Sequence, residues 1–224
     1  MNRKIRIDFK GHDNLTSSAI SHYIQQTDIN YVKLMIIQNI CSLIESGINP
    51  DNFVVATKSS ELYKTNAIEY DNTDDYIILA SKQDSAKKFW NIINRHHRPV
   101  VFYKENNEYI PIFNYSDENR LLIRNIKVNS PVAISLEGAG SSMVDLYYAS
   151  DREQRSKIEW ENQQLGQVAQ NIDDIARASS TINNPNVSDG VKVYANNILS
   201  QVMARQVKLN QDIGISDTTI NVLA

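Results

Sequence analysis

The sequence predicts an α+β domain with a mainly antiparallel sheet and helices on one face, followed by a C-terminal antiparallel helical hairpin. Three observations support this fold class. Strand-like and helix-like segments alternate up to about residue 140, two pairs of strand-like segments are joined by short polar connections, and nearly everything after residue 140 has helical character. We therefore expect an α+β domain over 1–138, a helical hairpin over 139–211 and a tail over 212–224.

The composition bounds the class of protein. The chain has 224 residues, a net charge of −3, 42% hydrophobic residues, 7 Gly and 5 Pro, which excludes collagen-like and low-complexity chains and argues against wholesale disorder. The slightly acidic balance argues against nonspecific nucleic-acid binding. No apolar run approaches the roughly 18–20 residues that span a bilayer, and no apolar core follows the charged first residues, so neither a membrane span nor a secretory signal is expected.

Cysteine usage adds one further limit. Cys41 is the only cysteine, which excludes an internal disulfide and a multi-cysteine zinc site. It lies in an apolar stretch, where a free cysteine is usually a small buried hydrophobe. This fits a reducing compartment, and we expect a cytoplasmic protein.

Two helices are expected early in the chain. The first covers 17–25 and is capped by Thr16 or Ser17, and the second begins with Asp28 as its cap and runs to Ser46, where Gly47 ends it. The second helix is apolar on two sides, with one series of apolar residues at Ile29, Val32, Ile36, Ile40 and Leu43 and another beside it. A helix of this kind is buried on both sides.

The strands are predicted from alternating or continuous runs of apolar residues. Residues 4–9 alternate with period two, which is typical of a half-buried strand. The run over 76–80 is continuous and favours a central position in the sheet. A helix starts at Asp84 or Ser85 and ends near Arg95, because Pro99 prevents its continuation. The remaining strands are expected over 53–57, 100–103, 109–113, 121–128 and 132–136, and the last four form two hairpins.

The second half of the chain begins with the Gly-Ala-Gly-Ser-Ser segment over 138–142, which we interpret as a hinge. A long helix follows over 142–182, with apolar residues at a and d positions of a short heptad pattern. After a turn at 183–186, a second helix runs from Ser188 to about Leu209, and the two helices are predicted to form a hairpin. For the tail, two alternatives stay open: a strand added to a sheet, or disorder.

The functional hypothesis comes from the lengths of these two helices. Helices of about 40 and 20 residues span roughly 60 and 30 Å, so the shorter cannot cover the apolar stripe of the longer. We expect a non-enzymatic adaptor, scaffold or assembly subunit that self-associates or binds a protein partner through its C-terminal helices. The alternative is that both helices simply fold back on the sheet. The residues expected to make the contact are Val144, Leu146, Ile158, Leu165, Val168, Ile172, Ile175, Ile198 and Val202.

A second hypothesis concerns the densest cationic cluster, residues 95–98. Arg95, His96 and Arg98 could bind an anion, which would make the protein a small-molecule or nucleotide sensor. The plain interpretation is that cations complement the dipole at a helix C-terminus. His96 and His97 are adjacent and diverge, and zinc-ligand spacing is absent, so no metal site is expected. No cofactor and no catalytic residues are expected, and docking to a membrane-bound complex through a partner is a third alternative.

Overall fold

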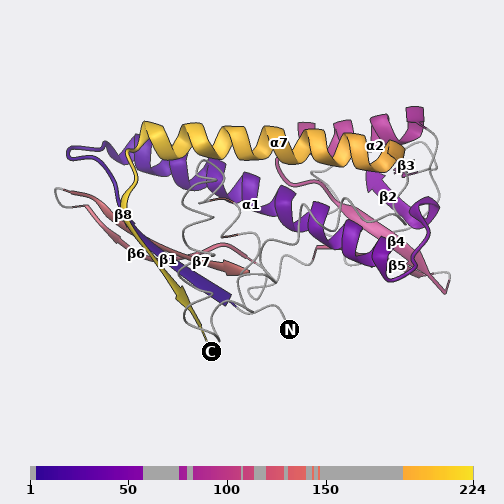
Figure 1. Cartoon of the computed structure of the whole chain (residues 1–224), viewed down its shortest axis with the longest axis horizontal. Coiled ribbons are helices and arrows are strands. Elements are labelled where there is room, and N and C mark those ends of the chain that lie inside the picture. Colours follow the sequence, from indigo (N-terminus) through magenta and orange to yellow (C-terminus); the bar gives the residue numbers. More distant parts are fainter. Residues whose placement is uncertain are drawn as a thin grey trace. The chain divides into compact units, whose positions relative to one another are not determined.

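The computed structural model describes residues 4–57, 76–79, 83–106, 108–113, 120–128, 131–139, 143, 146 and 189–223. The described residues form a mixed α+β fold with antiparallel sheets and three helices, as the sequence predicts in its coarse form (Figure 1). In chain order the elements are β1 (Lys4–Lys10), α1 (Ser17–Glu45), a 3-10 turn (Pro50–Asn52), β2 (Phe53–Ala56), β3 (Tyr76–Ile78), α2 (Gln83–Arg95), β4 (Val101–Glu105), β5 (Glu108–Pro111), β6 (Leu122–Lys127), β7 (Ala133–Ala139), α7 (Asp189–Asp212) and β8 (Ser216–Val222).

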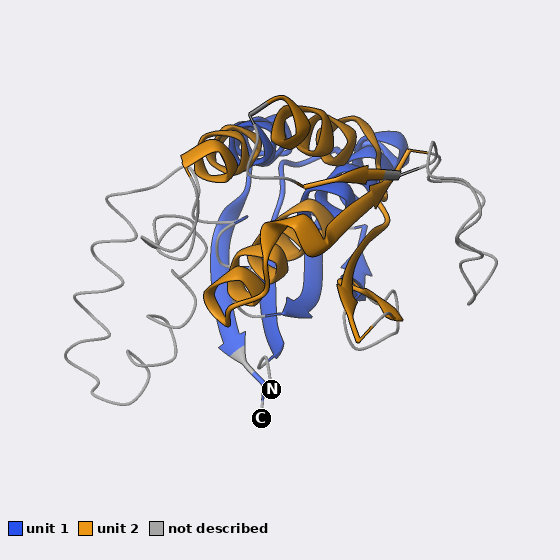
Figure 2. Cartoon of the chain, turned by 90° about the vertical axis from the view of Figure 1, so that its right-hand side faces the viewer, with its two compact units in different colours: residues 1–31, 115–178, 201–224 blue, residues 32–114, 179–200 orange. Residues whose placement is uncertain are grey.

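The chain divides into two compact units, each built from separate stretches of sequence (Figure 2). The first unit comprises 1–31, 115–178 and 201–224, and the second comprises 32–114 and 179–200. The division passes through α1 and through α7. The domain bounds expected at residues 138 and 211 stay a prediction.

The sheet of the first unit has the strand order β6-β7-β1-β8, and every neighbouring pair is antiparallel. Ile7 of β1 lies opposite Leu136 of β7 and Ile220 of β8. The hairpin of β6 and β7 is confirmed. The last strand settles the open question about the tail, because its residues pair with β1 at the far end of the chain.

One face of this sheet is apolar and packs against the first half of α1. Ile5, Ile7 and Phe9 alternate along β1 and are at most 2% exposed, as period-two strand geometry requires. The Phe9 ring meets the Tyr23 ring edge to face, with centroids 5.7 Å apart. The hydroxyl of Tyr31 accepts a hydrogen bond from the Ala139 amide at 2.7 Å. These contacts attach α1 to β1 and to the end of β7.

The hinge expected at 138–142 is wrong for its first two residues. Gly138 and Ala139 are the last residues of β7, and their register partners are Ile5 and Lys4. A Cβ on Gly138 would lie 3.0 Å from both the Met143 side chain and the Tyr31 ring. The glycine is therefore explained by close packing rather than by flexibility, while residues 140–142 lie outside the described residues.

Helix α1 is a single helix, so the expected break before Asp28 is wrong. Thr16 caps the helix, because its hydroxyl accepts a hydrogen bond from the Ala19 amide at 3.1 Å. Asp28, the expected cap of a second helix, lies within the continuous helix, and the neighbouring Thr27 is 0% exposed. At the other end Gly47 has a φ of 100°, and the Ile48 amide bonds to the Leu43 carbonyl at 3.0 Å, which is a glycine C-cap as predicted.

The second unit has its own sheet, in the order β3-β2-β4-β5, so the described strands form two sheets where one was expected. The hairpin of β4 and β5 is confirmed. The central position expected for 76–80 is wrong, because β3 is at the end of this sheet among the described strands and Ile78 is 51% exposed. Helix α2 packs against β2 and β3. Its Phe89, Trp90 and Ile93 side chains are buried.

The C-terminal half has one described helix. Helix α7 (Asp189–Asp212) confirms the expected helix from Ser188 to about Leu209. The predicted helix over 142–182 lies outside the described residues apart from Met143 and Leu146, so the helical hairpin is not confirmed. Within the part of the chain that the structure describes, no helix combines the length and apolar character needed to cross a membrane.

Candidate functional site

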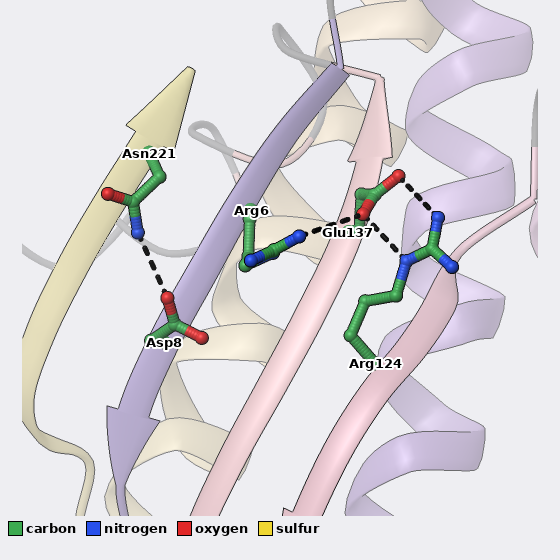
Figure 3. A network of polar contacts seen from close by, with 5 residues as sticks. All are labelled: Arg6, Asp8, Arg124, Glu137 and Asn221. Atoms are coloured by element: carbon green, nitrogen blue, oxygen red, sulfur yellow. Dashed lines mark hydrogen bonds and ion pairs between the residues drawn. The ribbon is translucent and has the colours of Figure 1, made fainter. Parts of the chain in front are cut away.

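The second face of the β6-β7-β1-β8 sheet is polar, and a buried carboxylate lies on it. Glu137 of β7 is 2% exposed and stands opposite Arg6 in the register. Its carboxylate accepts hydrogen bonds from Nε and Nη2 of Arg124 at 2.7 and 3.0 Å, and Nη2 of Arg6 lies 3.9 Å away. Figure 3 shows the two arginines approaching Glu137 from opposite sides. One carboxylate thus links β6, β7 and β1.

The charge of Glu137 is maintained by these neighbours. The hydrogen bonds from Arg124 lower the pKa of Glu137 more than burial raises it, and the positive charges of Arg124, Lys4 and Arg6 lower it further. The bidentate geometry is the strong form of this interaction. A second cross-strand contact completes the row, because Nδ2 of Asn221 on β8 donates to Oδ2 of Asp8 on β1 at 2.9 Å (Figure 3). This face is suited to holding the four strands in register.

A partly open depression of about 180 Å³ lies on the same face. Two of its charged residues, Lys10 and Asp217, form an ion pair with an N···O distance of 2.8 Å. The lysines and aspartates that line it are equal in number, so the depression has no strong preference for an anion or a cation. Its lining residues are Asp8, Phe9, Lys10, Asn125, Lys127, Ala133, Ile134, Ser135 and Asp217.

The apolar face of this sheet is covered unevenly. On β7, Ile134 and Leu136 are at most 2% exposed. Their register partners on β6, Ile126 and Ile123, are 36% and 47% exposed, and Val128 just beyond the strand is 66% exposed. Strand β6 is at the end of the sheet among the described strands. The three side chains therefore form an apolar row, the β6 row, that the described helices leave open to solvent.

The cationic cluster of residues 95–98 lies where the sequence places it, at the C-terminal end of α2. Arg95 is the last helical residue, His96 is partly exposed, and His97 and Arg98 are exposed. The cluster gains a member that the sequence reasoning missed, because Lys33 of α1 is 1% exposed and its Nζ donates to the Asn94 carbonyl at 2.5 Å. A lone lysine between Val32 and Leu34 in an apolar stretch was the signal that could have revealed it.

The pKa of His96 is lowered by its surroundings. Burial lowers its pKa, and the positive charges of Arg95, Lys33 and His97 lower it further. The imidazole is thus kept mostly neutral at neutral pH. Lys33 places its charge on a carbonyl at the helix C-terminus, where the backbone dipoles favour cations.

The residues expected to contact a partner fall into two groups. Leu146, Ile198 and Val202 are buried in the chain, at 0%, 4% and 0% exposed. Ile198 and Val202 belong to a buried stripe of α7 that also includes Val191 and Ala195. The other six lie outside the described residues, and they are Val144, Ile158, Leu165, Val168, Ile172 and Ile175.

Within the first unit, α7 is joined to α1 by a buried polar network, which sequence reasoning did not find. The Gln206 amide oxygen accepts from Nδ2 of Asn30 at 3.0 Å, and its nitrogen donates to the Thr27 hydroxyl at 3.1 Å and to Asn210 at 2.9 Å. The Tyr23 hydroxyl donates to the same Asn210 oxygen at 3.2 Å. The Gln206 side-chain nitrogen donates two hydrogen bonds and its oxygen accepts one. The network therefore fixes how these turns of α1 and α7 align.

Cys41 is buried, and burial followed by the charge of Glu45 raises its pKa to about 12, so its thiol remains protonated. The described residues contain no group of three or more His, Cys, Asp or Glu side chains that could hold a metal ion.

Comparison of the chain with protein-family profiles, with curated proteins and with solved structures gives no match.

Proposed function

We propose that the protein is a non-enzymatic assembly subunit, adaptor or scaffold that self-associates or binds a protein partner. The observation that carries the proposal is the β6 row, Ile123, Ile126 and Val128, whose side chains are 36% to 66% exposed on the otherwise covered apolar face of a sheet. Contiguous exposed apolar residues are uncommon on soluble monomers and mark contact surfaces. A protein surface that excludes water from this row would stabilise the complex.

The C-terminal helices are a second contact region, in which the predicted stripe over 142–182 rather than α7 faces the partner. The apolar stripe of α7 is already covered by other residues of the same chain, since Val191, Ala195 and Val202 are each 0% exposed. Ile198 and Val202 therefore support the contact from within, by holding α7 in place. The stripe predicted over 142–182 is the part that would face a partner, because α7 is committed to contacts with the rest of its own chain.

The test is the mass of the full-length chain in solution, measured by light scattering over a range of concentrations. We expect a mass above the 25.5 kDa of one chain, or a stoichiometric partner that co-purifies under native conditions. The double substitution Ile123→Glu and Ile126→Glu in the β6 row should lower that mass, whereas Val193→Glu, a matched change of an exposed apolar residue on α7, should not. A chain that stays monomeric and isolates without a partner overturns the proposal.

A second candidate function is that of an anion sensor, and one observation favours it. Lys33 adds a buried cation beside Arg95 and His96, so the local field is more positive than the sequence cluster alone indicates. A thermal-shift series with inorganic phosphate and with nucleotides tests it. A rise in Tm with the wild-type chain that is absent from Arg98→Ala and present in Lys87→Ala supports the sensor. An unchanged Tm in the wild-type chain overturns it.

A further inference from the structure

The sheet of the first unit ends in two strands of different character. Among the described strands, β6 and β8 each pair with one neighbour only, β7 and β1 respectively. The outward side of an edge strand presents backbone N–H and C=O groups to solvent, which is a template for pairing with another strand. Both ends of this sheet therefore have the backbone groups needed to extend it.

The directions of the strands are compatible with extension by a second copy. Each neighbouring pair in β6-β7-β1-β8 is antiparallel, so β6 runs opposite to β8. If β8 of a second copy lies beside β6, the new pair is also antiparallel. The two sheets then continue as one, with no change of pairing type.

Charge favours this pairing over the pairing of two β6 strands, with Asp217 shared between Lys10 of its own chain and Lys127 of the second copy. Strand β6 carries Arg124 and Lys127 and no acidic residue, whereas β8 carries Asp217 and no basic residue. Lys127 and Asp217 line the same depression, so both lie on the polar face of the sheet. Like charges directly opposite each other on neighbouring strands are destabilising, and opposite charges are stabilising.

The apolar face is compatible as well. Ile123 and Ile126 face the same side as the buried Leu136 and Ile134. Ile220 of β8 pairs with the buried Ile7 and faces that side too. A head-to-tail junction therefore sets the β6 row beside an isoleucine and removes apolar surface from water.

We propose that β6 of one copy pairs with β8 of a second copy, so that the sheets join head to tail through Lys127 and Asp217 on one face and the β6 row on the other. This inference rests on the self-association arm of the proposed function and names its surface. A head-to-tail contact uses two different patches, so it leads to a ring or to an open chain of copies rather than to a symmetric pair.

The experiment uses charge reversal in the full-length chain, with mass measured by light scattering. We expect the wild-type mass to rise with concentration beyond that of two copies. Lys127→Asp and Asp217→Lys should each reduce association at least several-fold, because each places like charges at the junction. An equimolar mixture of the two variants should regain the wild-type mass, because every junction between different variants then joins opposite charges.

Controls separate this arrangement from others. Lys208→Asp changes an exposed lysine of α7 and should leave the mass unchanged. Ile126→Lys inserts a charge into the β6 row and should reduce association at least several-fold, and a melting curve like that of the wild-type chain shows that it folds. Retention of the full mass by Asp217→Lys overturns the inference in favour of pairing between two β6 strands.

A wild-type chain that is monomeric at every concentration also overturns it. In that case a co-purifying partner protein would still uphold the proposed function, so the two failures are distinguishable.

Discussion

Glu137 and Arg124 form a bidentate pair, with hydrogen bonds of 2.7 and 3.0 Å, although Glu137 is 2% exposed and half of the Arg124 side chain is in solvent. The pair joins β6 to β7 on the polar face of the sheet. Because a buried charge without a partner is costly, the pair couples the position of the edge strand to the interior of the sheet. Loss of this pair would weaken the attachment of β6, the strand that carries the exposed apolar row.

Glu137→Gln should lower the free energy of unfolding by about 1–2 kcal/mol at neutral pH, because hydrogen bonds to a charged group become hydrogen bonds to a neutral amide. The pKa of Glu137 in the folded chain is below its ordinary value of 4.5. Its contribution is therefore complete above that value and is lost as the pH falls through the lower folded-state pKa. Urea titrations at several pH values should show the difference between wild type and variant narrowing in acid. The exposed Glu108→Gln is the control, and a difference that is constant with pH contradicts the assignment.

Gln206→Ala should destabilise the chain by about 2–3 kcal/mol, because it leaves the buried amide of Asn30 and the hydroxyl of Thr27 without the bonds they share with Gln206. Chemical unfolding followed by circular dichroism measures the loss. Lys208→Ala, on the exposed side of the same helix, should change the stability by less than about 0.5 kcal/mol. Equal effects of both substitutions would show that α7 is not held to α1 by this network.

Cys41 should be unreactive in the folded chain. Its pKa is raised to about 12 by burial and by the charge of Glu45, so at about pH 8 almost no thiolate is available to attack a disulfide reagent. With Ellman's reagent, we expect less than one tenth of the thiol to react in the time that the unfolded chain takes to react fully. Rapid stoichiometric labelling under native conditions would contradict the burial.

Lys33→Met should raise the pKa of His96, because it removes one of the positive charges that, after burial, keep that pKa low. It should also lower the free energy of unfolding by about 1–2 kcal/mol, since the Asn94 carbonyl loses a charged donor. An NMR titration of the His96 ring protons gives the first quantity. Lys87→Met, on an exposed position of α2, should move neither. An unchanged His96 pKa in Lys33→Met would place the lysine too far away to act.

Local patterns predicted individual elements well where one face of the element is buried. Alternation over 4–9 corresponds to β1, the caps at Thr16 and Gly47 are present, and both hairpins form. The prediction failed where a polar residue has a distant partner. No break occurs at Asp28, which lies inside the continuous α1. The neighbouring Thr27 can be buried there because its hydroxyl accepts a hydrogen bond from Gln206, which is 179 positions away. Local propensity cannot register such a contact.

The candidate surfaces were also predictable only where their residues are neighbours in the sequence. The cationic cluster at 95–98 was visible as a run of residues, but Lys33 joins it only through the packing of α1. The exposure of Ile126 could not be predicted, because β6 and β7 carry equally apolar residues at Ile126 and Ile134. Which of two paired strands is covered depends on where the helices lie, and no property of either strand specifies that.

The sequence by itself determined the α+β class, the antiparallel pairing within each hairpin, the ends of most helices and the burial of Cys41, since each follows from periodicity or from neighbours in the chain. Only the tertiary structure decided that the described strands form two sheets, that the last strand pairs with the first, and that Glu137, Gln206 and Lys33 find their partners. Those outcomes depend on contacts between residues far apart in the chain, whose energies are set by burial in the folded state rather than by local conformational preference.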